Sequence, residues 1–406
     1  MRGRFLKLAA AAVILTSVAS PSSAQAVDAD ALHRRILILD GHADVLLPST
    51  PARYQAPDGG SRVSLPRLDA GGVDAIVLSL AVGPGPRDAA GISAARADVD
   101  AKLAVIRDWI AAHPERLGLA LSADDVERLR REGRIAVLIG FQNARSIGAD
   151  ISRIDALYRD GVRIFAFNHA GHNDFSDSSR PSNEPDAEHG GLSPLGREAV
   201  ARLNDLGVLI DVSQLSTDAL LQTLQLTRAP VAATHSSARA LIDNGRNLSD
   251  RELDAIRANG GVVQVTPFSA YLRDPGDDYR RRVGEIRARF GLSEAFLSAT
   301  DGANRLPDVR QREFTDAVYA VRPARATLSD YVDHIDYIAR RIGWEHVGIG
   351  TDFDHGSGVD GFDSAEEAPN VTRELLRRGY SEEQIAAIWS GNFLRVLRGA
   401  EAAARP

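Results

Sequence analysis

The run VDAIVLSLAV, residues 73–82, is apolar at almost every position instead of at alternate positions. Consecutive apolar residues over so short a length are typical of a parallel strand that is covered on both faces. Runs of the same kind recur along the chain: ILILD (36–40), IAVLIGF (135–141), RIFAFN (163–168), GVLIDVS (207–213), APVAATH (229–235), GVVQVTP (261–267) and HVGIGTDF (346–353). Eight such strands with helical patterns between them predict an α/β chain folded as a (β/α)8 TIM barrel.

The segments between these runs support a barrel. Residues 94–112 and 328–342 carry apolar stripes at helical spacing. No GxGxxG follows the first run, which argues against the alternative, a doubly wound dinucleotide-binding sheet. Two connections are long, residues 171–193 and 271–327, and we predict that these insertions form a lid or rim at the carboxyl ends of the strands.

The amino terminus reads as an export signal. MRGRFLK is basic, residues 8–18 are mostly apolar, and Ala24-Gln25-Ala26 is a small-x-small cleavage site. A membrane anchor is the alternative, but this apolar run is shorter than the roughly 20 residues that span a bilayer. We therefore predict a signal peptide over residues 1–26, one barrel domain over residues 27–406, and a periplasmic or secreted protein without a membrane span.

Composition narrows the chemistry. The chain has 406 residues, of which 44% are hydrophobic and 25% charged, enough for one large core. Cysteine is absent, so a metal would have to be held by histidines and carboxylates. The net charge is −7 and basic residues gather only near residues 280–289, which argues against a nucleic-acid partner and favours a small-molecule substrate.

Polar side chains follow four of the predicted strands. His42 and Asp44 lie two apart after the first, so both project to the same side. His169, His235 and Asp352 end the fourth, sixth and eighth strands. Each alone is as easily a structural group, but a barrel would bring all of them to one mouth, where a cation would offset the crowded carboxylates.

Six segments carry a resemblance to a known family: LDGHAD, FNHAGHND, GLSPLGREAVARLNDLGVLIDVSQLS, ATHSSARAL, GRNLSD and GIGTDFDHG. In this order, from about residue 37 to residue 397, they resemble the membrane, or renal, dipeptidases and their bacterial relatives. Those proteins are zinc-dependent barrel hydrolases. The resemblance therefore implies the same fold and a metal-dependent hydrolysis of dipeptides.

The resemblance also implies roles for individual residues. His42 and Asp44 would bind a first metal, with Asp352 beside it as proton shuttle, and His235 would bind a second metal. His169 would donate to the oxyanion formed at the scissile carbonyl. Arg246 would clamp the terminal carboxylate of the substrate, and a guanidinium suits that task.

The chain departs from the family pattern at two ligands. Gln142, in FQNARSI, stands where the family has a glutamate that bridges both metals, and Gln214, in IDVSQLS, stands where it has a histidine. An amide oxygen is a weak zinc ligand, so we expect one divalent ion, zinc, and amides that bond to each other, to water or to substrate. His172 and His355 could replace the lost ligands, but we interpret them as ordinary loop histidines.

We therefore predict an exported hydrolase that cleaves the amide bond of dipeptides or similar small carboxylated substrates. One alternative is a binding protein on an inactive dipeptidase scaffold. Another is a one-metal amidohydrolase for N-acyl amino acids or lactams. A homodimer is compatible with all of these readings.

Overall fold

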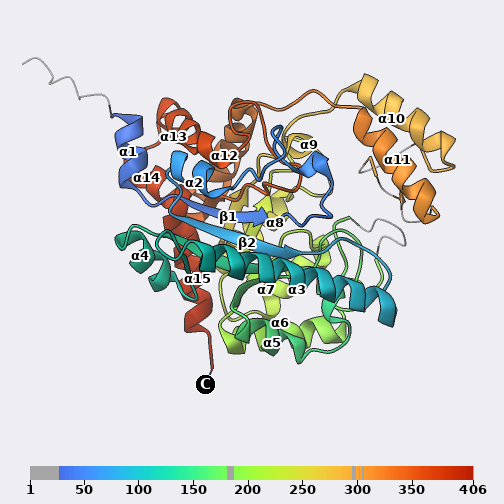
Figure 1. The fold of residues 1–406 in the computed structure, drawn as a ribbon, viewed down its shortest axis with the longest axis horizontal. Helices are drawn as coiled ribbons and strands as arrows, with labels where there is room; N and C mark the ends of the chain where they lie inside the picture. Colours follow the sequence, from blue (N-terminus) through green and yellow to red (C-terminus); the bar gives the residue numbers. More distant parts are fainter. Residues whose placement is uncertain (1–26, 181–186, 295–298, 301, 304–305, 406) are drawn as a thin grey trace, which may run out of the picture.

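The computed structural model describes residues 27–180, 187–294, 299–300, 302–303 and 306–405 (Figure 1). The predicted signal peptide, residues 1–26, lies outside the described residues, so its removal stays a prediction. Residues 181–186, which are part of the first insertion, also lie outside the described residues. Among the described residues, no helix has the length and apolar character needed to cross a bilayer.

Parallel strands form a closed barrel in the order β1-β2-β4-β5-β6-β7-β8-β9. Their bounds are β1 Leu39–Asp44, β2 Ala75–Ala81, β4 Ile135–Gln142, β5 Val162–Ala166, β6 Leu209–Asp211, β7 Ala232–Ser236, β8 Val262–Val265 and β9 Val347–Ile349. The chain just after β9 closes the ring, because the Asp44 N–H donates to the Phe353 carbonyl at 2.8 Å. The predicted TIM barrel is confirmed.

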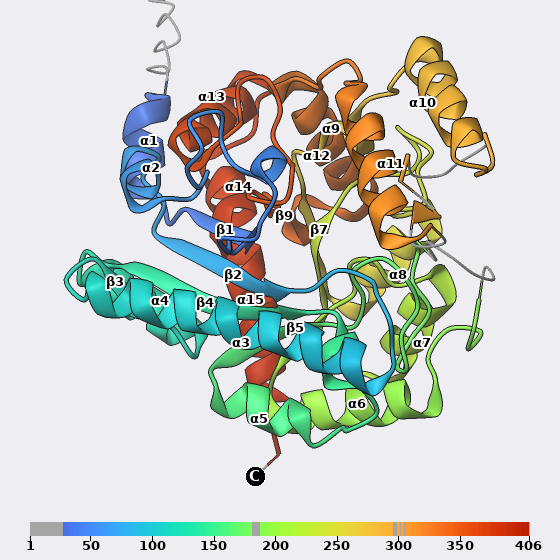
Figure 2. The ribbon, with the colours of Figure 1, turned by 45° about the vertical axis from the view of Figure 1, so that its right-hand side comes forward.

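Helices surround the barrel in both views (Figures 1 and 2). Their bounds are α1 Ala29–Arg35, α2 Leu65–Ala70, α3 Ala89–Ala112, α4 Ala123–Arg131, α5 Arg153–Arg159, α6 Pro194–Leu206, α7 Thr217–Leu226, α8 Asp250–Asn259, α9 Ser269–Leu272, α10 Asp277–Arg289, α11 Asp308–Ala320, α12 Leu328–Ile342, α13 Ala368–Arg377, α14 Glu382–Ala386 and α15 Asn392–Ala402. The helices predicted over residues 94–112 and 328–342 are α3 and α12. The Thr327 capping box starts α12, and Gly343 ends it.

The strands are mostly shorter than the predicted runs, and two differences change the assignment of strands. The first strand was expected over residues 36–40 but runs over Leu39–Asp44, because its polar end still pairs with β2 and with Phe353. Consequently His42 and Asp44 lie within the strand. An additional short strand, β3 Leu117–Leu119, pairs with β4 outside the barrel order.

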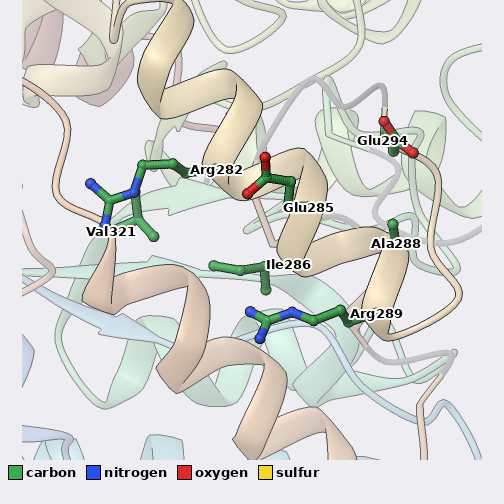
Figure 3. A pocket seen from close by; sticks show the side chains of 7 residues that line it. All are labelled: Arg282, Glu285, Ile286, Ala288, Arg289, Glu294 and Val321. Carbon is green, nitrogen blue, oxygen red and sulfur yellow. The ribbon is translucent and has the colours of Figure 1, made fainter.

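Helices α10 and α11, drawn in yellow-orange and orange, stand together outside the helix ring in both views (Figures 1 and 2). They share a small apolar cluster of their own, centred on Val283, Phe314 and Val318. A hollow of about 550 Å³ lies beside α10 and the end of α11. Figure 3 shows the side chains that line it, among them the charged Arg282 and Glu285. This hollow contains none of the strand-end histidines, so the chemistry lies elsewhere.

The carboxyl ends of the strands carry backbone strain. Positive φ angles at non-glycine residues occur, in the described segments, at Asn143, Ala170, Gln214, Asp352 and Asp354. All five follow strands β4, β5, β6 or β9 on the same side of the barrel. Each such conformation costs about 1–3 kcal/mol, and strain of this kind gathers at functional sites. The strand ends are therefore the place to examine.

Candidate metal centre

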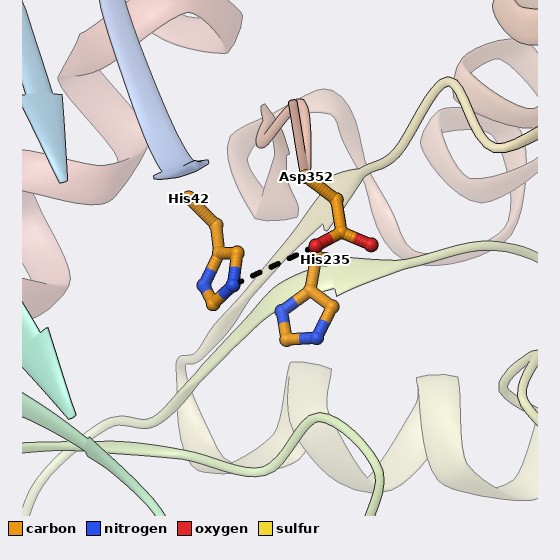
Figure 4. A group of neighbouring side chains, drawn as sticks. All are labelled: His42, His235 and Asp352. Atoms are coloured by element: carbon orange, nitrogen blue, oxygen red, sulfur yellow. Dashed lines mark ion pairs between the residues drawn. The ribbon is translucent and has the colours of Figure 1, made fainter. Parts of the chain in front are cut away.

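Three buried side chains from different strands converge at the mouth of the barrel. His42 comes from β1, His235 from β7, and Asp352 from the turn after β9, and one ligand atom of each lies within 4.8 Å of the others. Figure 4 shows them pointing toward one another. The seam between β1 and β9 is fixed by Asp40, whose carboxylate accepts the Thr351 N–H at 2.8 Å and hydroxyl at 2.6 Å.

Glycine at position 41 lets the β1 backbone approach the barrel interior. A Cβ added there would lie 1.8 Å from the amide nitrogen of Gln264, a buried side chain on β8. That amide donates to the Ile349 carbonyl at 3.0 Å and cannot move away freely. Because it has no Cβ, Gly41 lets β1 pack closely against Gln264, and His42 follows it in the strand.

The arrangement around His42 fits a divalent ion. His42 Nε2 lies 3.9 Å from Asp44 Oδ1 and 3.8 Å from Asp352 Oδ1. Two ligand atoms bonded at about 2.1 Å can be at most about 4.2 Å apart across one ion. His42 Nε2 and Asp44 Oδ1 are buried and have no hydrogen-bond partner among the described residues. Buried polar atoms left in this way need a partner, and a cation would satisfy both.

The two carboxylates differ in acidity. Burial would raise the pKa of Asp44, but the charges of Lys102 and His355, and a hydrogen bond from His355, hold it below its usual range. Burial raises the pKa of Asp352, and the negative charge of Asp44 adds to the rise. Asp44 is therefore the anionic member of the pair, and Asp352 is the one suited to carry a proton.

His235 makes hydrogen bonds that involve both unexpected glutamines. The Gln214 oxygen accepts the Ala170 N–H at 3.0 Å, which turns its NH2 group toward His235 Nε2, 3.2 Å away. The Gln142 Nε2 lies 3.1 Å from the same nitrogen. Burial keeps the pKa of His235 well below its usual value, so its Nε2 accepts both bonds.

This geometry corrects one expectation. The amides of Gln142 and Gln214 were expected to bond to each other, to water or to substrate, but both face His235 instead. The physical reason is that an unprotonated imidazole nitrogen is a good acceptor placed between two donors. The lone pair with which His235 would bind a second metal is thus already engaged.

His355 also lies at the site, so its interpretation as an ordinary loop histidine is wrong. Its Nδ1 lies 2.7 Å from Asp44 Oδ2, and its Nε2 lies 3.0 Å from Nε2 of His169. Tyr54 stacks flat on the ring, with centroids 5.1 Å apart. Burial lowers the pKa of His355, but the charge and hydrogen bond of Asp44 outweigh it and raise the pKa to about 9. Its position three residues after Asp352 was the available signal in the sequence.

His169 therefore accepts from His355 and keeps its own proton on Nδ1. Burial, together with the positive charge of His355, keeps the pKa of His169 well below its usual value. Its Nδ1 is buried and has no hydrogen-bond partner within the described parts of the chain. The site thus contains a neutral imidazole with an unused N–H.

Arg246 packs behind His235 from the loop between β7 and α8. Its Nη2 donates to the His235 carbonyl at 2.6 Å and its Nη1 to the Ser236 hydroxyl at 3.2 Å. The guanidinium lies over the ring of Tyr271 at 5.5 Å. Its buried Nε has no partner among the residues described, so the Nε–H is unused and could bind a substrate group.

Within the described parts of the chain, the group that could hold a metal, His42, His235 and Asp352, does not include His172. Its Nδ1 accepts the Ser178 N–H at 3.0 Å and lies 3.4 Å from Asp177 Oδ1. These contacts tie together the loop that begins the first insertion. The interpretation of His172 as a loop histidine holds for this geometry.

Comparison with known proteins agrees with this site. The chain matches the family model described as membrane dipeptidase (peptidase family M19) over residues 27–406. The chain belongs to the membrane dipeptidase family. Among solved M19-like structures, the probable dipeptidase PvdM from Pseudomonas aeruginosa is 39% identical, with a TM-score of 0.85 over 93% of this chain and 98% of that one.

Curated relatives of this family member include Dipeptidase tcpJ from Claviceps purpurea and Dipeptidase 3 from Macaca fascicularis. The first is 31% identical over 71% of this chain and 56% of its own length. The second is 30% identical over 92% of this chain and 67% of its own length. The chain thus spans a little over half the length of the fungal relative.

Proposed function

We propose that this member of the membrane dipeptidase family is a metal-dependent hydrolase that cleaves the amide bond of dipeptides or similar small carboxylated substrates. The observation that carries the proposal is that His42 Nε2 lies 3.9 Å from Asp44 Oδ1 and 3.8 Å from Asp352 Oδ1, while His42 Nε2 and Asp44 Oδ1 are buried without a hydrogen-bond partner among the described residues. These residues would hold the ion. The family membership supports a divalent metal, and the histidine and carboxylate donors suit zinc.

We further propose that one ion is bound. The charges of Asp44 and Asp352 balance a single divalent cation. His235 is the remaining family ligand of the second position, and its Nε2 already accepts from Gln142 and Gln214. Binding a second ion would require both bonds to break and would add two positive charges without a further carboxylate.

The other side chains of the site would have separate roles in the hydrolysis. A divalent ion supplies polarisation of the carbonyl oxygen and a more acidic water. His169 is placed to donate its Nδ1 proton to the oxygen of the scissile carbonyl as negative charge develops there. Asp352 would take up a proton at its carboxylate and pass it to the leaving nitrogen. Arg246 would use its remaining Nε–H for the terminal carboxylate of the substrate.

Metal content and a dipeptide panel test this proposal. Purified protein is expected to contain one equivalent of zinc and to hydrolyse at least one dipeptide. His42→Ala should lose both properties, because it removes the nitrogen that anchors the cluster. His113→Ala, at the end of α3, is the matched control and should retain them. An unchanged rate in His42→Ala would exclude the metal mechanism.

A binding protein is the second candidate, and the two glutamines favour it. If catalysis needs two ions, Gln142 and Gln214 leave a site that grips a carboxylated ligand through Arg246 without turnover. Metal-free protein that binds dipeptides, combined with no hydrolysis under any metal supplement, would support this candidate. Metal-dependent turnover would exclude it.

We also propose that the protein is exported. The predicted cleavage site falls just before Val27, and the family match begins at residue 27. Cell fractionation should recover the shortened chain outside the cytoplasm. A homodimer stays a prediction.

A further inference from the structure

The hydroxyl of Thr234 lies between both histidines of the barrel mouth. Its Oγ is 2.8 Å from Nδ1 of His235 and 3.2 Å from Nδ1 of His42. The same oxygen lies 2.6 Å from Oδ2 of Asp211. All four side chains are buried, so no solvent competes for these contacts.

Counting donors and acceptors assigns each of these bonds. A hydroxyl has one hydrogen and two lone pairs. The Asp211 carboxylate accepts only, and its other oxygen already takes the backbone N–H groups of Ser213 and Thr234 at 2.8 and 3.0 Å. The Thr234 hydrogen therefore points to Asp211. Its two lone pairs then face His235 and His42, and each histidine must donate from Nδ1.

The opposite ring nitrogens follow from this assignment. With Nδ1 protonated, Nε2 of a neutral imidazole is bare. For His42 that nitrogen is the unpartnered atom facing Asp44 and Asp352. For His235 it is the nitrogen between the amides of Gln142 and Gln214. The two amide donors beside His235 require a lone pair on its Nε2, so both ends of that ring agree. The Nε2 of His42 faces carboxylate oxygens, and a lone pair suits that place when a cation lies between them.

We propose that Thr234, held by Asp211, is a positioning residue that fixes both His42 and His235 in the tautomer with the proton on Nδ1. The same hydroxyl thereby directs Nε2 of His42 toward the proposed metal, and it directs Nε2 of His235 toward the two glutamine amides in place of a second metal. The bare Nε2 of His42 and the metal affinity rest on the proposed function; the Nδ1 protons of both rings and the tautomer of His235 do not. Groups that orient a ligating histidine in this way typically contribute 10–100-fold to metal affinity.

The tautomers can be read without a metal. In the metal-free full chain at neutral pH, NMR of the histidine ring nitrogens should show protonated Nδ1 for both residues and bare Nε2 for His235. Signals are assigned by their loss in His42→Ala and His235→Ala. A bare Nδ1 on His42 or His235 in the unmodified protein would overturn the proposal, and this measurement needs no Thr234 variant to fold.

Thr234→Val keeps the shape of the side chain and removes the shared oxygen. We expect it to mix the tautomers and to raise the zinc dissociation constant about 10–100-fold, measured by chelator competition. Thr234→Ser should restore both readings. Thr223→Val is the matched control, because it removes a buried hydroxyl that bonds only to the Ala219 carbonyl, within α7.

The outcomes separate this inference from the proposed function. Unchanged tautomers and zinc affinity in Thr234→Val would overturn the inference while leaving the hydrolase intact. If the unmodified chain binds no zinc at all, the proposed function fails, and the ring-nitrogen spectra still decide the tautomers.

Discussion

The double substitution Gln142→Glu with Gln214→His should convert the centre from one ion to two. It returns a carboxylate and an imidazole to positions 3.1 and 3.2 Å from His235 Nε2, where amide groups now stand. It also removes the two hydrogen bonds that engage this nitrogen. His235 would then be available as a ligand beside two new ones.

The magnitude follows from those contacts. Each lost bond to His235 contributes about 0.5–1.5 kcal/mol, and a new buried carboxylate without a cation costs several kcal/mol more. The free energy of unfolding of the metal-free double variant should therefore be at least about 3 kcal/mol lower than that of the unmodified chain. Zinc at about 1,000 times its dissociation constant should raise the free energy of unfolding of the double variant by about 4 kcal/mol.

Urea unfolding with and without zinc measures the free energies, and elemental analysis after dialysis counts the ions. Gln264→Glu is the matched control, because this buried barrel glutamine bonds to the Ile349 carbonyl and not to His235. It should lose stability without gaining an ion. A double variant that still binds one equivalent of zinc would show that Gln142 and Gln214 do not limit the number of ions.

Three further substitutions have defined outcomes. Burial lowers the pKa of His334 to about 4, against 6.5 when unfolded. The unfolded chain therefore takes up this proton first as pH falls, and about 3 kcal/mol of stability should be lost between pH 6.5 and pH 4. His334→Asn, which keeps an acceptor for the Ala238 N–H, should lack that component in urea titrations at both pH values. Asp352→Asn should lower kcat about 10²- to 10⁴-fold in dipeptide assays through loss of proton transfer, and a rate within twofold of the unmodified enzyme would contradict that role. Gly41→Ala should destabilise by about 1–3 kcal/mol in thermal unfolding because its Cβ overlaps Gln264, and an unchanged Tm would show that this contact relaxes freely.

The barrel could be predicted from the sequence because its strands are buried on both faces and so read as unbroken apolar runs. VDAIVLSLAV became β2 at Ala75–Ala81. Polar positions carried less signal: β1 extends to Asp44 although its apolar run ends at residue 40. β3 is three residues long, too short for any periodicity to show.

Much of the site could be placed for a related reason, since strand ends in a barrel meet at one mouth. His42, Asp44, His235 and Asp352 converge as strand position indicates. The bonding partners could not be predicted in this way. That Gln142 and Gln214 both point at His235, and that His355 reaches Asp44, depends on side-chain directions and on turns with positive φ that leave little trace in residue type.

Anomalous scattering at the zinc edge, from crystals grown in excess zinc, locates and counts the ions at the barrel mouth. We expect one peak per chain, bounded by His42 Nε2 and the carboxylates of Asp44 and Asp352. A second peak beside His235 Nε2, with the Gln142 and Gln214 amides turned away, would contradict this expectation. So would the absence of any peak at the barrel mouth.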